Sequence, residues 1–97
     1  MLILGIETSC DDTSVALVKS GSRVVDQITS SQVKIHSRFS GVVPELASRE
    51  HLSNINWMVE KILKSIPKGE RIDAVAVTAG PGLVGSLLVG YMTAQVL

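Results

Sequence analysis

The sequence has little cysteine, few aromatic residues and no excess charge of either sign. Its single cysteine, Cys10, excludes an internal disulfide and therefore the small disulfide-rich secreted scaffolds. Its three aromatic residues are 3% of the chain, too few to predict a surface on which nucleic-acid bases stack. The net charge of +0 predicts no attraction to nucleic acid or to an anionic membrane. Contact with nucleic acid would need a local patch or another chain.

The chain also lacks the signatures of export and of membrane insertion. No basic region precedes the N-terminal apolar run, and Glu7 interrupts that run, so a signal peptide is not predicted. The longest apolar stretch, 83–97, contains Ser86, Thr93 and Gln95 and is shorter than the roughly 20 residues of a membrane span. We therefore expect a cytoplasmic protein with no membrane partner.

What is present is an ordinary globular composition, 45% apolar and 19% charged, in a chain long enough for one domain at most. Residues 2–6 form an apolar run without alternation, which is typical of a strand buried on both faces. Residues 13–19 and 23–31 have the pattern of two further strands, with a turn at Ser20 between them. Three short consecutive strands predict an antiparallel meander.

The second half of the sequence predicts two helices around one strand. Residues 44–66 begin with proline and carry apolar residues at spacings of three and four, which indicates an amphipathic helix. The stripe consists of Leu52, Ile55, Val59, Ile62, Leu63 and Ile66. Residues 72–79 predict a buried strand and 84–97 a second helix, so the order is βββαβα, an α/β mixed sheet with helical cover. Because Leu97 lies within an apolar helical pattern, we expect a fragment whose active site is incomplete.

The polar turn between the first two strands is the first segment that could carry chemistry. A tight turn presents main-chain N–H groups and hydroxyls to one point, which suits an anion such as phosphate. Glu7, Asp11 and Asp12 would repel a bare phosphate, which favours an intervening metal ion or a carboxylate that orients a nucleophile. The alternative is a polar hairpin tip whose acids face water, and the pattern alone does not separate the two.

Cysteine and histidine are weaker candidates. Cys10 could be a nucleophile, but no neighbour that would activate a thiolate is evident, so a structural cysteine is favoured. His36 and His51 could bind a metal, but no third ligand stands out, so structural or hydrogen-bonding roles are favoured. The apolar stripe of the long helix could dock a partner, although a plain core face is the commoner meaning of such a stripe.

The glycine turn at Gly80, Pro81 and Gly82, between the last predicted strand and helix, is the second candidate segment. Glycines let the backbone approach a ligand closely, and a helix N-terminus favours negative charge. These three residues are therefore predicted to bind substrate. The turn has neither the Walker Gly-Lys-Ser/Thr ending nor the Rossmann fingerprint. The alternative is a plain strand-to-helix turn in which Gly85 and Gly90 permit close helix packing.

Three strings of residues carry a resemblance to one family. They are Gly-Ile-Glu-Thr-Ser-Cys-Asp-Asp-Thr at 5–13, Gly-Val-Val-Pro-Glu-Leu-Ala-Ser-Arg followed by His within 41–51, and the run at 74–85 that contains Thr-Ala-Gly-Pro-Gly-Leu-Val-Gly. On these strings the chain resembles the start of the bacterial tRNA threonylcarbamoyladenosine transferases, the TsaD or Gcp family. The resemblance implies an actin-like, ribonuclease H-like fold of two lobes, in which residues 1–97 would be a truncated N-terminal lobe.

The resemblance also implies an activity. Members of the family transfer a threonylcarbamoyl group from threonylcarbamoyl-adenylate to N6 of the adenosine next to the anticodon of tRNA. By resemblance, Asp11 and Asp12 are catalytic residues at the reactive end of the adenylate, and Ser9 binds the substrate. The family often has Glu in place of Asp12, which keeps the carboxylate and changes its reach. One divalent metal, iron or zinc, is implied in the full-length protein, with no ligand in this chain.

Partners are implied as well. Helices 44–66 and 84–97 would pair with the shorter paralogue TsaB, the ATPase TsaE would join the assembly, and tRNA would bind to the whole. The chain alone is expected to be inactive, so the alternative function is a non-catalytic interaction lobe that pairs with TsaB. A sugar kinase or chaperone lobe is disfavoured because the first hairpin lacks Asp-Xaa-Gly-Thr/Ser, and a protease because no Ser-His-Asp arrangement is evident.

Overall fold

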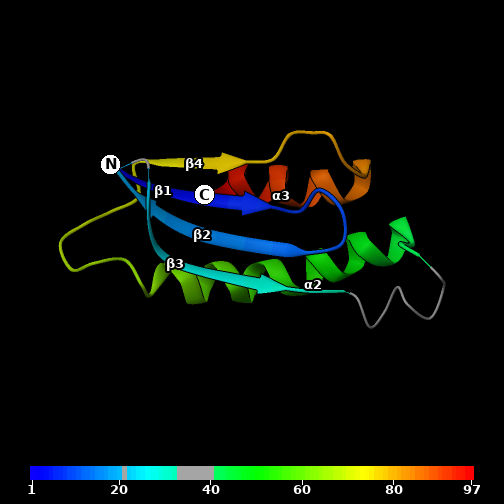
Figure 1. Ribbon diagram of the computed structural model, residues 1–97, viewed down its shortest axis with the longest axis horizontal. Coiled ribbons are helices and arrows are strands. Elements are labelled where there is room, and N and C mark those ends of the chain that lie inside the picture. Colours follow the sequence, from blue (N-terminus) through cyan, green and yellow to red (C-terminus); the bar gives the residue numbers. More distant parts are fainter. Residues whose placement is uncertain (21, 33–40) are drawn as a thin grey trace.

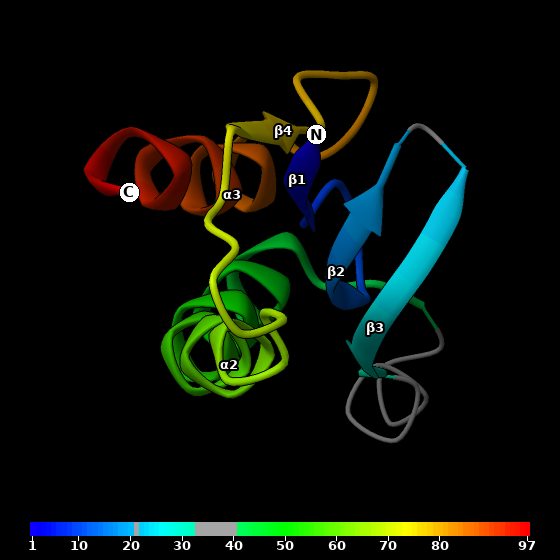
Figure 2. The same ribbon diagram turned by 90° about the vertical axis from the view of Figure 1, so that its left-hand side faces the viewer.

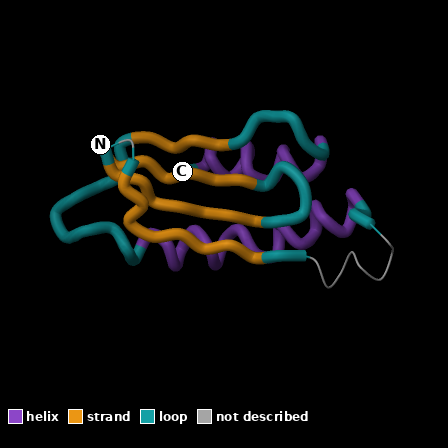
Figure 3. Tube along the Cα trace, viewed as in Figure 1, coloured by secondary structure: helices purple, strands orange, loops and turns teal. Residues whose placement is uncertain are grey.

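The computed structural model describes residues 1–20, 22–32 and 41–97. Its helices and strands follow the predicted order βββαβα (Figures 1 and 3). They are β1 (Leu2–Glu7), β2 (Thr13–Lys19), β3 (Arg23–Ser30), α2 (Pro44–Leu63), β4 (Ala74–Val77) and α3 (Val84–Val96). The candidate His36 lies outside the described residues. Within those ranges no helix combines the length and the apolar character needed to cross a membrane.

The four strands form one mixed sheet in the order β3-β2-β1-β4. β1 and β3 each pair antiparallel with β2, and β1 pairs parallel with β4. α2 lies in the long connection from β3 to β4, because two parallel strands cannot be joined by a tight turn. Both helices lie against the same face of the sheet (Figure 2). The prediction of a mixed α/β sheet with helical cover is therefore confirmed, with the cover on one face.

The core lies between the sheet and the two helices. Alternate residues of β1 and β2 are buried, as the two-residue period of a strand requires. The buried apolar residues of this layer are Leu2, Leu4, Ile6, Val15, Leu17, Ile55, Met58, Val59, Ile62 and Val89. The prediction that β1 is buried on both faces is wrong. Its second face is only half-buried, because both helices pack on the first.

The buried face of α2 is rotated relative to the predicted stripe. Leu52 is 60% exposed, whereas the preceding residue, His51, is fully buried. Neighbouring residues of a helix lie about 100° apart around its axis, so burial of one turns the other toward solvent. The stripe counted apolar residues alone and therefore missed a histidine that the fold buries. Ile55, Val59 and Ile62 of the stripe are buried as predicted.

The ends of several elements also differ from the predictions. β4 is shorter than the predicted 72–79, because it pairs only with Ile3–Ile6 of β1. The prediction that this strand is buried is wrong, because β4 is an edge strand whose residues are exposed or half-buried. α2 ends at Leu63 rather than at residue 66, where the chain tightens into turns with hydrogen bonds from each N–H to the carbonyl three residues earlier. β3 and α3 each end one residue before the predicted end.

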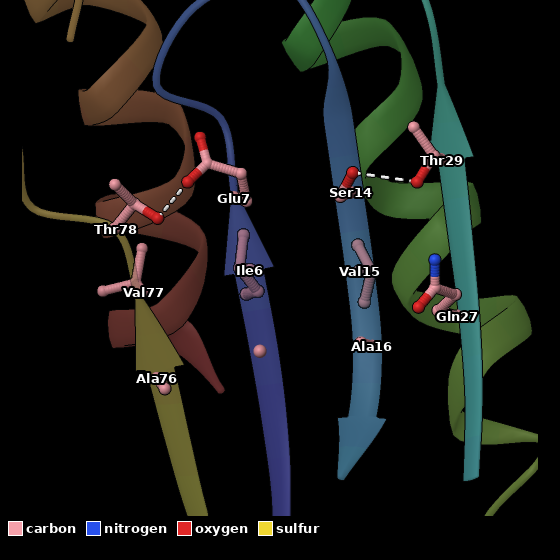
Figure 4. Close-up of a pocket in the computed structure, with 11 residues that line it drawn as sticks. Ile6, Glu7, Ser14, Val15, Ala16, Gln27, Thr29, Ala76, Val77 and Thr78 are labelled. Carbon is pink, nitrogen blue, oxygen red and sulfur yellow. Dashed lines mark hydrogen bonds between the residues drawn. The ribbon is translucent and has the colours of Figure 1, made fainter. Parts of the chain in front are cut away.

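The sheet face opposite the helices carries small residues at its centre. Gly5 of β1 pairs with Ala16 of β2 on one side and with Ala76 of β4 on the other. These three residues lie in the wall of a pocket of about 400 Å³, which Glu7 and Thr78 line at the end where β1 finishes (Figure 4). The turn that holds the predicted site begins at this end of the sheet.

Candidate functional site

The turn between β1 and β2, residues 8–12, carries most of the predicted site. It begins where β1 ends beside β4, so it lies near the glycine turn that follows β4. Hydrogen bonds reach the turn from α3, from the residue before α3, and from α2. The conformation of the turn is therefore set by three segments distant in sequence.

Thr8 fastens the start of the turn to α3. It is fully buried because it continues the inward-facing series that begins at Leu2. Its hydroxyl donates to the Ser86 carbonyl over 2.6 Å and accepts from the Gly90 N–H over 3.1 Å. A Cβ at Gly90 would lie 2.6 Å from Thr8 Oγ1, so α3 can lie this close to Thr8 only with glycine at residue 90. The structure supports the close helix packing considered for Gly90.

Ser9 meets the glycine turn that precedes α3. The Leu83 N–H donates to the Ser9 carbonyl over 2.7 Å. A Cβ at Gly82 would lie 2.8 Å from Ser9 Cβ, so glycine is required for the two turns to approach. Two of the predicted substrate-binding residues, Ser9 and Gly82, are thus brought together. The other two, Gly80 and Pro81, are exposed on the same turn.

Glu7, the last residue of β1, ties the turn to the end of β4. One carboxylate oxygen accepts the Ser9 N–H over 2.5 Å, and the other accepts the hydroxyl of Thr78 (Figure 4). Burial by itself raises the pKa of Glu7, but the hydrogen bonds from Ser9 and Thr78 outweigh burial and lower the pKa below its ordinary value. Glu7 therefore carries a negative charge at neutral pH, and its carboxylate links the turn at Ser9 to Thr78, the residue after β4.

His51 of α2 holds the second half of the turn. Its Nε2 lies 2.9 Å from the Cys10 carbonyl oxygen, and its Nδ1 lies 2.7 Å from the Thr13 hydroxyl. A carbonyl can only accept, so Nε2 carries the hydrogen, and in the neutral ring Nδ1 accepts from Thr13. His51 is thus a hydrogen-bonding histidine, the role that the sequence favours.

Asp11 and Asp12 lie between these anchors. The residues that line an open pocket of about 290 Å³ at the turn are Glu7, Ser9, Cys10, Asp11, Asp12 and Ser14. Burial, followed by the charges of Asp11 and Asp12, raises the pKa of the Cys10 thiol. A raised pKa disfavours the thiolate that a nucleophile needs, so a structural role fits Cys10 better. The predicted catalytic pair, by contrast, borders a space that a ligand can enter.

Comparison with known proteins decides the family. The profile of the family described as "TsaD: tRNA N6-adenosine threonylcarbamoyltransferase" matches residues 23–97. The chain belongs to this family. The tRNA N6-adenosine threonylcarbamoyltransferase of Caldicellulosiruptor saccharolyticus is 54% identical to it over 98 residues, which cover 100% of this chain and 29% of that protein. The protein of the same name from Bacillus anthracis is 52% identical over 95 residues, covering 97% and 28%.

This TsaD-family chain therefore spans less than a third of the length of the curated relatives it matches. Among solved structures, YeaZ from Pseudomonas aeruginosa superposes with a TM-score of 0.63 at 24% identity, over 97% of this chain and 37% of that one. A protein described as similar to peptidase YeaZ from the same organism gives 0.60 at 25%, over 97% and 36%. The predicted fold class, an actin-like α/β fold with a mixed sheet, is confirmed.

The described part of this TsaD-family chain does not form a metal site by itself. Within residues 1–20, 22–32 and 41–97, no group of three or more His, Cys, Asp or Glu is placed to hold an ion. The acids around the turn therefore do not fit the divalent metal that the resemblance implies. Its ligands remain predicted elsewhere in the longer protein.

Sequence reasoning missed the threonines that anchor the TsaD-family turn. Thr8 follows the alternation of β1, and Thr13 begins the alternation of β2, so both positions belong to the buried face. A buried hydroxyl requires a partner, and this signal could have marked both residues as anchors. The bond between Thr78 and Glu7 had no such signal, because it depends on the register of β4 against β1.

Proposed function

We propose that this chain is part of the N-terminal lobe of an enzyme that transfers a threonylcarbamoyl group from threonylcarbamoyl-adenylate to N6 of the adenosine next to the anticodon of tRNA. Membership of the TsaD family and the names of its relatives support this reaction. The chain covers at most 29% of the relatives considered, so the activity belongs to a longer protein. The chain alone is expected to be inactive.

The anchored turn that presents Asp11 and Asp12 to an open pocket is the observation that carries the proposal. Hydrogen bonds hold the turn at Thr8, at Ser9 and at Cys10. The two carboxylates are therefore displayed from a fixed backbone. Group transfer depends on such fixed placement, because a misplacement of about 1 Å can cost roughly 100-fold in rate.

The transfer requires a proton acceptor beside the attacking nitrogen. The N6 amino nitrogen attacks the carbonyl carbon of the threonylcarbamoyl group, a C–N bond forms, and the bond from that carbon to the phosphate oxygen breaks, which releases AMP. The amino nitrogen must lose a proton, and a carboxylate of Asp11 or Asp12 within hydrogen-bond reach can accept it. We assign these two as the catalytic residues on this basis.

The glycine turn is proposed to bind the substrate together with Ser9. α3 begins directly after this turn, and a helix N-terminus favours an anion such as the phosphate of an adenylate. Gly80, Pro81 and Gly82 are exposed, so their backbone is accessible to such a group. One divalent metal, iron or zinc, belongs to the proposal for the longer protein, and no step above depends on it.

We further propose that α2 and α3 pair with a TsaB-type paralogue in the cytoplasm. The exposed large apolar residues of the two helices are Leu52, Trp57, Val84, Leu88, Tyr91, Met92 and Val96. Leu88, Tyr91 and Met92 are neighbours at spacings of three and four on α3, and a contiguous exposed apolar patch is typical of a protein interface. The likeness to the YeaZ structures supports a partner of related fold. A TsaE-type ATPase and tRNA complete the proposed assembly.

The same exposed residues favour a second candidate, a non-catalytic lobe whose function is pairing alone. Mixing the 97-residue chain with the paralogue, then assaying modified adenosine with tRNA and the adenylate donor, separates the two properties. We expect a complex and no turnover. Turnover by this chain would contradict a metal site outside it, and a folded chain that forms no complex would contradict the pairing.

Substitution of Asp11 in the longer enzyme tests the catalytic proposal. Asp11→Ala removes one of the two proposed proton acceptors, and we expect the transfer rate to fall at least about 100-fold, since general base catalysis contributes roughly that much. Asp12→Glu keeps a carboxylate and should stay within about tenfold of the parent. Glu70→Ala removes an exposed acid beside Lys19, at the end of the sheet opposite the turn; it is the matched control and should not change the rate. Near-normal transfer by Asp11→Ala, with the melting temperature unchanged, would refute the assignment.

A further inference from the structure

One buried imidazole brackets the acidic pair from both sides. The His51 ring bonds the carbonyl of Cys10, the residue before the pair, and the hydroxyl of Thr13, the residue after it. Asp11 and Asp12 are the only residues between these two contacts. A single side chain of α2 therefore spans the part of the turn that displays both carboxylates.

The other anchors hold only the first half of the turn. The bonds from α3 and from the residue before it end at Thr8 and Ser9. Within the part of the chain that the structure describes, no hydrogen bond to the Asp12 carboxylate is recorded. The direction of that carboxylate thus depends on the backbone between residues 10 and 13, which the imidazole holds.

Histidine suits this position for a chemical reason. Its two ring nitrogens lie on opposite sides of a rigid ring, so one donates to a carbonyl while the other accepts from a hydroxyl. The ring has no exposed surface, and the buried Ala47 and Ile55 lie one helical turn away on either side of it. The surrounding core therefore limits movement of the ring away from the turn.

We infer that His51 is a positioning residue, which orients Asp11 and Asp12 for the transfer through its bonds to Cys10 and Thr13 without touching the substrate. This inference rests on the proposed function, in which the two acids are catalytic. It predicts that loss of the two hydrogen bonds of His51 slows the chemical step and leaves tRNA binding unchanged, because the imidazole does not contact the tRNA.

The test uses the full-length enzyme in its assembly and a set of three variants. His51→Ala removes both bonds, and we expect kcat to fall about 100-fold with KM for tRNA unchanged. His51→Gln places an amide donor near the position of Nε2, restores the bond to Cys10 and should recover at least about tenfold of that loss. Thr13→Val removes only the second bond at almost constant shape and should fall between the parent and His51→Ala.

A spectroscopic measurement separates this inference from the proposed function. Backbone amide shifts of Asp11 and Asp12 report the turn whether or not the enzyme transfers anything. We expect them to move in His51→Ala and to return toward the parent in His51→Gln, and long-range proton–nitrogen spectra of the parent should show the hydrogen on Nε2. If the parent transfers no threonylcarbamoyl group but the amide shifts change as expected, the proposed function is contradicted. The positioning of the turn by His51 is then still supported.

Two results would overturn the inference. One is a kcat of His51→Ala within about twofold of the parent; the other is unmoved Asp11 and Asp12 amides in that variant. If His51→Ala does not fold, His51→Gln and Thr13→Val carry the same comparison. A Thr13→Val enzyme with the parent's kcat and with the parent's amide shifts would then be the decisive negative result. A rise in KM for tRNA at constant kcat would also contradict a positioning role.

Discussion

The hydroxyl of Thr8 accepts a hydrogen bond from the main-chain N–H of Gly90 over 3.1 Å, although 82 residues separate the two in the sequence. The same hydroxyl donates to the carbonyl of Ser86, four residues before Gly90. One side chain of the hairpin thus bonds both backbone groups that face each other across a turn of α3. The close contact between Gly90 and Thr8 therefore sets the distance between α3 and the hairpin. The two hydrogen bonds of Thr8 set the rotation of α3 about its axis.

Gly90→Ala is expected to destabilise the fold. The added Cβ would lie 2.6 Å from Thr8 Oγ1, which two hydrogen bonds hold in place, and 3.3 Å from methyl groups of Ile6 and Val77. Overpacking costs about 1–3 kcal/mol, which exceeds the ~1 kcal/mol that alanine gains over glycine in a helix. Urea unfolding should therefore show a net loss of free energy of unfolding.

Gly85→Ala is the control for Gly90→Ala, because it makes the same substitution in the same helix. Its Cβ would meet only the hydroxyl side chain of Ser48, which can rotate away. We expect this variant to be more stable than Gly90→Ala. Equal stability of the two variants would contradict the rigid contact at Thr8.

Thr8→Val should destabilise the fold without changing its shape. The substitution removes the two hydrogen bonds by which the Thr8 hydroxyl ties the hairpin to Ser86 and Gly90 of α3. A hydrogen bond contributes about 0.5–1.5 kcal/mol, so we expect a loss of about 1–3 kcal/mol. Thr29→Val, which removes only a solvent-exposed hydrogen bond to the Ser14 hydroxyl, is the control and should stay within about 0.5 kcal/mol of the parent. A Thr8→Val loss no larger than that of Thr29→Val would refute the anchoring role.

Much of the fold follows from patterns within single elements. The apolar run of β1, the loose alternation of β2 and the stripe on α2 predict these three elements and much of the core. The phase of α2 could not be predicted, because His51 replaces Leu52 on the buried face for reasons that lie in another element. A polar side chain becomes core only when its partners are in place, and those partners, Cys10 and Thr13, are distant in sequence.

The candidate site was predictable as a turn but not as an assembled structure. The polar run with Asp11 and Asp12 marks the turn, and glycines mark the approach of α3. Which glycine touches which residue depends on how the two turns meet, and Gly82 against Ser9 emerges only from the packed fold. Glu7 was noted for its charge alone, whereas its function in the fold is to bond the Ser9 N–H and the Thr78 hydroxyl.

Glu7 should make stability depend on pH in the acid range. Hydrogen bonds from Ser9 and Thr78 overcome burial and lower its pKa in the fold, so the unfolded chain takes up a proton first as pH falls. The stabilisation is present above the ordinary glutamate pKa of about 4.3 and is lost as pH falls through the lowered value. The parent should therefore lose more free energy of unfolding than Glu7→Gln below about pH 5. Identical profiles for parent and Glu7→Gln would be the contrary result.

Leu88 tests whether the exposed face of α3 binds the proposed paralogue. Its side chain is 50% exposed and Met92, one helical turn on, is 61% exposed, so a charge at residue 88 should leave the fold intact. In an interface the same charge would be buried without a partner, and we expect Leu88→Glu to weaken binding at least about tenfold, or ~1.4 kcal/mol. Gln27→Glu adds the same charge at an exposed position of β3 on the sheet face opposite the helices, beside Ala16, and should leave binding unchanged. Titration of each variant against the paralogue measures the difference, and equal affinities would place the interface elsewhere.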